Sequence, residues 1–157
     1  MKIEVGKNAP AFSLQSSDGE DISLADLKGK NVVLYFYPKD DTPGCTIEAQ
    51  DFTKRLKDFE ALDAVVLGVS KDSVKSHCKF VEKYSLKVTL LADESQKTCQ
   101  DYDVIKEKSM LGKKYMGIER STFLINKIGK IAKIWRGVKV NGHVDEVIDA
   151  LKASMKS

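Results

Sequence analysis

The sequence predicts an α/β fold with a mixed central sheet, helices on both faces and an N-terminal hairpin. Apolar runs that fit buried strands alternate with stretches of helical spacing, and strands linked by helices pair in parallel. Two apolar strands near the carboxyl end are separated only by a tight turn, which adds antiparallel pairing. With 157 residues, of which 42% are hydrophobic and 31% charged, the chain fits one domain over residues 1–157 with a substantial core.

The first half of the chain begins with a hairpin and continues with a buried strand and a helix. Asp18-Gly19 is a hairpin turn signal, and it is flanked by the strand-like segments 12–14 and 22–24. The apolar run over 32–37 predicts a buried strand. Apolar residues recur after it at intervals of three and four and predict a helix that begins near Thr42: Ala49, Phe52, Leu56 and Phe59.

The remaining elements alternate in the same way. Strands are expected over 64–69, 88–92, 122–126 and 131–135, and helices over 73–84 and from about 93 to 102. Asp93 and Gln96 have the spacing of a capping pair for the short helix. The last helix places on one stripe Val144, Val147, Ile148, Leu151 and Met155. The stretch from Val104 to Glu119 is predicted to be a long loop, and loops of that length often shape a site.

The most informative segment is Pro38 to Cys45, which reads Pro-Lys-Asp-Asp-Thr-Pro-Gly-Cys. It delivers a cysteine to the first turn of a helix, at the carboxyl end of a sheet strand. Thr42 suits the N-cap and Pro43 the first helical position, which places Cys45 at about the third. Unpaired backbone N–H groups and the helix dipole favour a thiolate there. A cysteine that only fills the core needs neither the cap, nor the proline, nor the open backbone of Gly44.

This segment resembles the active-site pattern of peroxiredoxins, Pro-x-x-x-Thr-x-x-Cys, which Pro38, Thr42 and Cys45 match. The longer string Tyr-Pro-Lys-Asp-x-Thr-Pro-Gly-Cys-Thr-x-Glu is similar to the bacterioferritin comigratory (peroxiredoxin Q) branch. The resemblance covers essentially the whole chain, through the strings at 37–48, 72–77 and 117–125. It implies a thioredoxin-like fold and a thiol peroxidase without a cofactor. Such an enzyme reduces hydrogen peroxide and organic hydroperoxides through a thiolate and sulfenic acid cycle, here on Cys45.

Arg120 lies where the predicted loop enters an apolar strand. From its position alone it could equally pair with a surface acid. The resemblance matches it to the arginine that holds the peroxidatic thiolate, and a planar, permanently charged guanidinium suits that task. Thr42 and backbone N–H groups would help to stabilise charge that develops on the peroxide oxygens.

Two further residues of the segment keep alternative interpretations. Pro38 either shields the sulfur from water or simply ends the strand. Glu48 either orients a neighbouring arginine or favours the start of the helix.

The sulfenic acid formed on Cys45 must be reduced by a second thiol before further oxidation becomes irreversible. In relatives the resolving cysteine lies five residues after the first or in the next helix, but those positions here are Gln50 and Val81. Cys78 lies one helical turn before Val81. It is either the resolving cysteine or a core residue in a one-cysteine mechanism that uses an external thiol. Cys99 is expected to pack in the core.

Other catalytic classes fit the sequence less well. A Cys-x-x-Cys disulfide exchanger would need a cysteine at Glu48, and a copper-delivery module one at Ala49. His77 and His143 are too few and too scattered for a zinc site, so no metal is expected. The main alternative to a peroxidase is a thioredoxin-fold redox sensor or chaperone that uses Cys45 stoichiometrically.

Charge and cysteine usage restrict the partners and the compartment. The net charge of +3 is spread among interspersed lysines and acids, which argues against a nucleic-acid partner. The N-terminal residues contain no apolar stretch, so neither a signal peptide nor a membrane partner is expected. Three widely spaced cysteines favour a reducing cytoplasm. The resemblance implies a monomer reduced by thioredoxin, glutathione or a similar thiol.

Overall fold

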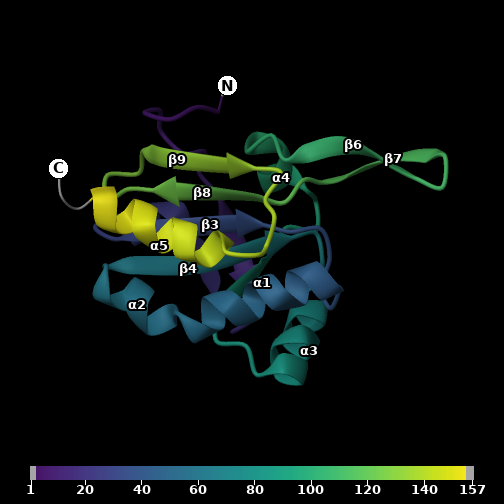
Figure 1. Cartoon of the computed structure of the whole chain (residues 1–157), viewed down its shortest axis with the longest axis horizontal. Coiled ribbons are helices and arrows are strands. Elements are labelled where there is room, and N and C mark those ends of the chain that lie inside the picture. The colour runs from purple at the N-terminus through teal and green to yellow at the C-terminus, as the bar shows by residue number, and fades with distance from the viewer. Residues whose placement is uncertain (1–2, 155–157) are drawn as a thin grey trace.

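The computed structural model describes residues 3–154, and its centre is a mixed sheet of seven strands in the order β2-β1-β5-β4-β3-β8-β9 (Figure 1). The strands are β1 Ser13–Ser16, β2 Asp21–Ser23, β3 Asn31–Phe36, β4 Ala64–Ser70, β5 Thr89–Ala92, β8 Ser121–Ile125 and β9 Ile131–Arg136. β4 runs parallel to β3 and β5, whereas β8 runs antiparallel to β3 and β9. β1 and β2 form the expected N-terminal hairpin. The predicted mixed sheet is therefore confirmed.

Helices cover both faces of the sheet (Figure 1). They are the 3-10 helix Leu24–Leu27 and the α-helices α1 Pro43–Lys54, α2 Leu56–Ala61, α3 Val74–Tyr84, α4 Lys97–Asp101 and α5 His143–Ser154. Residues of α1, α2, α3 and α5 pack in one apolar core, and α4 contributes Cys99 to the other. No helix among residues 3–154 is long and apolar enough to cross a membrane.

β3 separates the two cores. Alternate residues enter opposite cores, so that Val33 and Tyr35 face α1 while Leu34 and Phe36 face the other layer. All six residues of the strand are buried. Each fully buried large apolar side chain contributes about 2 kcal/mol, so β3 is firmly held. The segment that leads to Cys45 therefore starts from a fixed point.

The helix predicted to begin near Thr42 is interrupted. Arg55 leaves the helical conformation (φ −108°, ψ 10°), and its N–H bonds the carbonyl of Phe52 in a tight turn between α1 and α2. The apolar stripe continues from α1 into α2, since both Phe52 and Phe59 are completely buried.

The prediction of a long loop over 104–119 is wrong. Strands β6 Ile105–Met110 and β7 Lys113–Ile118 form a separate two-stranded sheet that projects from the body of the molecule (Figure 1). The turn between them has positive φ at Leu111 (52°) and Gly112 (80°), the geometry of a two-residue hairpin turn. A leucine rarely adopts positive φ, so the sequence carries no familiar turn signal there.

The helix ends show one further difference from prediction. Asp93 does cap α4, since its carboxylate accepts from the backbone N–H groups of Thr98 (3.3 Å) and Cys99 (2.7 Å). Gln96 is not its capping partner, because it adopts a left-handed conformation without a side-chain cap. The apolar stripe of α5 is confirmed through Leu151, whereas Met155 lies outside the described residues.

Candidate active site

Cys45 occupies the third position of α1 and is only 2% exposed. Pro43 takes the first helical position and Thr42 the N-cap, both as predicted. Thr42 does not cap with its side chain. Its hydroxyl donates instead to the carbonyl of Lys39 (2.8 Å), while its carbonyl accepts from the N–H of Thr46 (2.9 Å). The hydroxyl oxygen keeps its lone pairs available, because its proton is already engaged.

Arg120 reaches Cys45 because β8 pairs with β3. The register places Phe36 opposite Ser121, so Arg120 emerges beside the segment that leads into α1. Its Nη2 donates to the Cys45 sulfur at 3.3 Å, and its Nη1 donates to Glu48 Oε1 at 2.6 Å. A Cβ added at Gly44 would lie 3.1 Å from Arg120 Nη2, so glycine leaves the guanidinium room. Of the two interpretations of Glu48, the one that orients an arginine agrees with this geometry.

Glu48 is completely buried, and this controls its charge. Burial raises the pKa of Glu48 from 4.5 to about 7, although the charge of Arg120 acts to lower it. Its second oxygen, Oε2, has no hydrogen-bond partner among residues 3–154. The guanidinium of Arg120 is therefore shared between a sulfur and an incompletely satisfied carboxylate.

A second buried pair joins Asp40, in the same segment, to α3. The Asp40 carboxylate accepts from the hydroxyls of Tyr37 (2.6 Å) and Ser76 (2.7 Å), and its Oδ2 lies 2.7 Å from His77 Nδ1. The other ring nitrogen of His77 lies 2.9 Å from the Leu91 carbonyl. Both ring nitrogens of His77 therefore have an oxygen partner within hydrogen-bond distance.

This Asp40–His77 pair is missing from the sequence-based prediction. The available signal is that Asp40 falls in the Pro38–Cys45 segment and His77 in the similar string 72–77, 37 positions away. Only the fold shows that they meet.

His143 lies in a different environment. Its Nε2 is 2.8 Å from the Thr122 hydroxyl, and its ring packs edge-on against Phe52 and Trp135. Burial lowers the pKa of His143 to about 4, and the charge of Arg120 acts in the same direction. His143 is therefore neutral at physiological pH.

The other two cysteines have opposite surroundings. Cys78 is exposed, and its sulfur donates to the carbonyl of Ser17 at 3.3 Å, so its interpretation as a core residue is wrong. The buried residues of α3 are His77 and Phe80, so the face of the helix that packs on the core does not include Cys78. Cys99 is completely buried, and burial together with Asp93 raises its pKa, in line with the expected packing role.

Two other observations concern the predicted site. Pro38 is half-buried immediately after the buried Tyr37, at the entrance to the segment. No cluster of three or more His, Cys, Asp or Glu residues that could hold a metal occurs between residues 3 and 154.

Comparison with known proteins gives consistent results. The AhpC/TSA family matches residues 5–134. The sequence is 53% identical over 152 residues to Peroxiredoxin Bcp of Bacillus subtilis, covering 97% of each chain. It is 41% identical over 150 residues to Peroxiredoxin Bcp of Escherichia coli K12, covering 96% of each.

Solved structures agree with the sequence relatives. Peroxiredoxin Q from Xanthomonas campestris superimposes with a TM-score of 0.87 at 48% identity, over 90% of each chain. A PrxQ mutant from Xylella fastidiosa gives a TM-score of 0.93 at 42% identity, over 99% of each chain. Another structure of the Xanthomonas protein, which matches with a TM-score of 0.87, concerns its alkyl peroxide reduction activity.

Proposed function

The chain belongs to the AhpC/TSA family as a peroxiredoxin of the Bcp (peroxiredoxin Q) type, and we propose that Cys45 is the residue that attacks the peroxide. Family membership makes the protein a thiol-dependent peroxidase with a thioredoxin-like fold, a peroxide substrate and a thiol reductant. The sequence-based expectations of family, fold and activity are confirmed. The assignment of roles to individual residues is the proposal.

One observation carries the assignment of Cys45: Arg120 Nη2 lies 3.3 Å from its sulfur at the start of α1. In the proposed reaction the thiolate forms a bond to one peroxide oxygen while the O–O bond breaks. Hydroxide or alkoxide leaves and takes up a proton. Arg120 and the backbone N–H groups at the helix start stabilise both the thiolate and the charge that develops on the oxygens.

Thr42 and Pro38 complete the proposed site. The proton of the Thr42 hydroxyl is held by the Lys39 carbonyl, so its oxygen is free to accept a hydrogen bond from the protonated peroxide. Pro38 is half-buried, which supports a role in shielding the sulfur from water.

Reduction of the sulfenic acid has two proposed routes. In one, Cys78 is the resolving cysteine and forms a disulfide with Cys45; in the other, an external thiol reacts directly. A disulfide requires Cα atoms within about 7 Å, and it would require α3 and the start of α1 to open. His77 on α3 bonds Asp40 in the segment before α1, which supports coupled opening of the two regions. Exposure of Cys78 is compatible with either route.

The wider setting follows the expectations from sequence. We propose hydrogen peroxide and organic hydroperoxides as substrates and thioredoxin, glutathione or a similar thiol as reductant. A monomer in the cytoplasm, where three free cysteines would persist, completes the proposal.

The experiment that tests Cys45 compares three single variants. Cys45→Ser should abolish peroxide consumption driven by dithiothreitol, because it removes the nucleophile and keeps a side chain of similar size. Cys99→Ser and Cys78→Ser should still react with one equivalent of peroxide at the wild-type rate. Near-native peroxidase activity in Cys45→Ser would contradict the assignment.

The same samples separate the two routes of reduction. A wild-type monomer two mass units lighter after one equivalent of peroxide, with the Cys45 and Cys78 peptides joined, would identify Cys78 as resolving. Sulfenic acid without this disulfide would identify the one-cysteine route.

A further inference from the structure

The β6–β7 hairpin carries an unusual concentration of exposed apolar side chains. Large hydrophobic residues that are exposed number seven in the described chain, and four of them lie on this hairpin. They are Met110 (63% exposed), Leu111 (97%), Tyr115 (44%) and Met116 (60%). The remaining three, Val5, Ile47 and Ile128, are scattered. Exposed apolar side chains that cluster on one element generally mark an interaction site.

The construction of the hairpin supports the same conclusion. A two-stranded hairpin without a packed face is marginally stable in water. A connection from α4 to β8 needs only a few residues. Residues 105–118 instead form two strands that extend beyond the rest of the molecule (Figure 1). A partner that binds the projecting hairpin would stabilise it.

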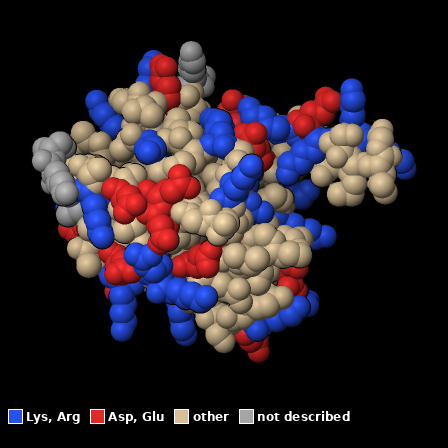
Figure 2. All heavy atoms as spheres, viewed as in Figure 1, with Lys and Arg blue, Asp and Glu red and all other residues tan. Residues whose placement is uncertain are grey.

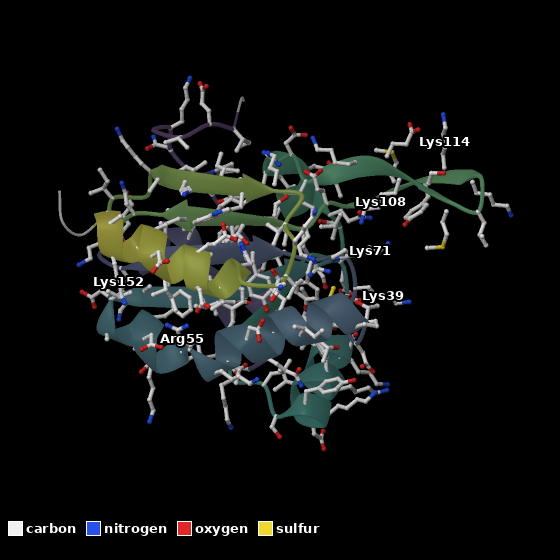
Figure 3. The ribbon with its side chains drawn as sticks, viewed as in Figure 1. Lys39, Arg55, Lys71, Lys108, Lys114 and Lys152 are labelled. Carbon is white, nitrogen blue, oxygen red and sulfur yellow. The ribbon has the colours of Figure 1, made fainter. Side chains whose placement is uncertain are left out.

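The charge of the hairpin specifies what kind of partner fits. Residues 105–118 contain four lysines (Lys106, Lys108, Lys113 and Lys114) against one acid, Glu107. Figure 2 shows blue side chains around the apolar end of the projecting arm. Lys39 and Lys71 lie on the same side of the molecule as Lys108 and Lys114 (Figure 3), and neither forms an ion pair with any described residue. An acidic surface with an apolar centre would complement this face.

The base of the hairpin lies beside the proposed active site. The aliphatic stem of Lys108 crosses Gly117, where an added Cβ would lie 3.2 Å from Lys108 Cδ. Burial lowers the pKa of Lys108, the charge of Arg120 lowers it further, and the charge of Cys45 opposes this effect. β7 ends at Ile118, two residues before Arg120, whose Nη2 donates to the Cys45 sulfur. A partner that binds the hairpin faces the end of the molecule that contains the sulfur.

We propose that residues 105–118 form a docking arm for an acidic protein dithiol of the thioredoxin type, an inference that rests on the proposed role of Cys45. On the external-thiol route, one thiol of the partner attacks the Cys45 sulfenic acid, releases water and forms a mixed disulfide. On the Cys78 route, it attacks the Cys45 sulfur of the Cys45–Cys78 disulfide, releases the Cys78 thiol and forms the same mixed disulfide. The second thiol breaks that bond, which leaves the partner oxidised to a disulfide and Cys45 reduced. Both electrons come from the partner's two thiols.

The arm fits a protein partner better than a membrane. Tyr115 and Met116 are consecutive residues of one strand, so their side chains leave opposite faces of the hairpin. A partner that holds both faces needs a groove, which a protein surface provides and a flat lipid surface does not. A membrane also supplies no electrons to the oxidised sulfur.

The test measures the Michaelis constant for thioredoxin in a peroxidase assay with thioredoxin reductase and NADPH. The arm variant is Lys113→Glu with Lys114→Glu. Its matched control is Lys57→Glu with Lys152→Glu, which makes the same charge change on exposed residues of α2 and α5, with Lys152 at the opposite end of the molecule (Figure 3). The arm variant should raise the constant about tenfold and weaken its dependence on salt, and the control should not. Leu111→Ser should raise it without changing the salt dependence.

Dithiothreitol separates this proposal from the proposed function. Every variant should consume peroxide with dithiothreitol at the wild-type rate, because the small dithiol needs no arm. If wild type fails even with dithiothreitol, the proposed function fails. If wild type works with dithiothreitol but not with thioredoxin, or if arm and control variants have equal constants, only the docking arm fails. Binding of the arm to vesicles of anionic phospholipid, or arm-dependent dimerisation, without a change in that constant would also overturn it.

Discussion

The Arg120–Glu48 and Asp40–His77 pairs both lie beside the start of α1, and they differ in how completely hydrogen bonds satisfy their polar atoms. The carboxylate of Asp40 accepts from two hydroxyls and one imidazole, and the other nitrogen of His77 is also bonded. In contrast, Glu48 Oε2 has no hydrogen-bond partner within the described part of the chain, and Arg120 directs a donor at the Cys45 sulfur. The Asp40–His77 pair fixes the position of a segment, whereas the Arg120–Glu48 pair leaves charge available for chemistry.

The difference in hydrogen bonding shows which pair lowers the stability of the folded protein. A buried polar atom without a partner costs about 1–3 kcal/mol, and the Arg120–Glu48 pair carries such an atom next to the cysteine. In the part of the chain that the structure describes, the Asp40–His77 pair has no such atom. Changes to Arg120 should therefore act mainly on rate, and changes to His77 mainly on stability.

The largest effect is expected at Arg120. Arg120→Met keeps much of the aliphatic stem but removes both donors, so the reaction of Cys45 with peroxide should slow about a thousandfold. Stopped-flow measurement of a single turnover tests this. Arg120→Lys should recover only part of the rate, because an ammonium lacks the planar fork. Native rates in both variants would show that Arg120 does not assist the reaction.

His77 should give the opposite outcome. His77→Ala leaves the buried Asp40 carboxylate without one of its hydrogen-bond partners, which should lower the free energy of unfolding by about 3 kcal/mol. Urea unfolding measures this, with His143→Ala as a control that removes the same volume from a buried histidine that has only a neutral hydrogen bond. The peroxide rate should change far less than in Arg120→Met. Equal stability losses in the two histidine variants would remove the distinction between the pairs.

Protonation of Glu48 should make the stability of the protein depend on pH. The pKa of Glu48 rises from 4.5 to about 7 through burial, so between those pH values the folded protein binds more protons than the unfolded chain. The stability gained from the protonated carboxyl is complete below pH 4.5 and is lost as the pH rises through 7. Relative to Glu48→Gln, which cannot titrate, wild type should lose about 3 kcal/mol between pH 4.5 and 8. A stability difference that is constant with pH would show that Glu48 does not titrate in this range.

The sequence predicts the parts of the site that depend on neighbouring residues. The apolar run, the proline and Thr42 are contiguous, so the placement of Cys45 follows from local rules. The position of Arg120 beside it depends on strand pairing and came from the family resemblance. The Asp40–His77 pair could not be predicted, because it depends on the packing of α3 against a distant segment.

The errors have equally specific causes. The hairpin at 105–118 turns at Leu111, a residue that rarely adopts positive φ. The interpretation of Cys78 as a core residue fails because the buried position of α3 is taken by the neighbouring His77, whose polarity conceals it in the sequence. In both cases tertiary contacts override the local pattern.

The smallest expected effect concerns Thr42, which lies in the segment between the two pairs. Thr42→Val deletes the hydroxyl that bonds the Lys39 carbonyl and keeps the backbone carbonyl that accepts from Thr46. The start of α1 should therefore persist, with a stability change of about 1 kcal/mol. The rate with peroxide should fall about tenfold, because one hydrogen bond to the substrate is lost. Thr42→Ser retains the hydroxyl and should react at nearly the native rate. If the valine and serine variants react equally fast, the Thr42 hydroxyl serves only to hold the Pro38–Cys45 segment through its bond to Lys39. Arg120 would then contact the peroxide without help from Thr42.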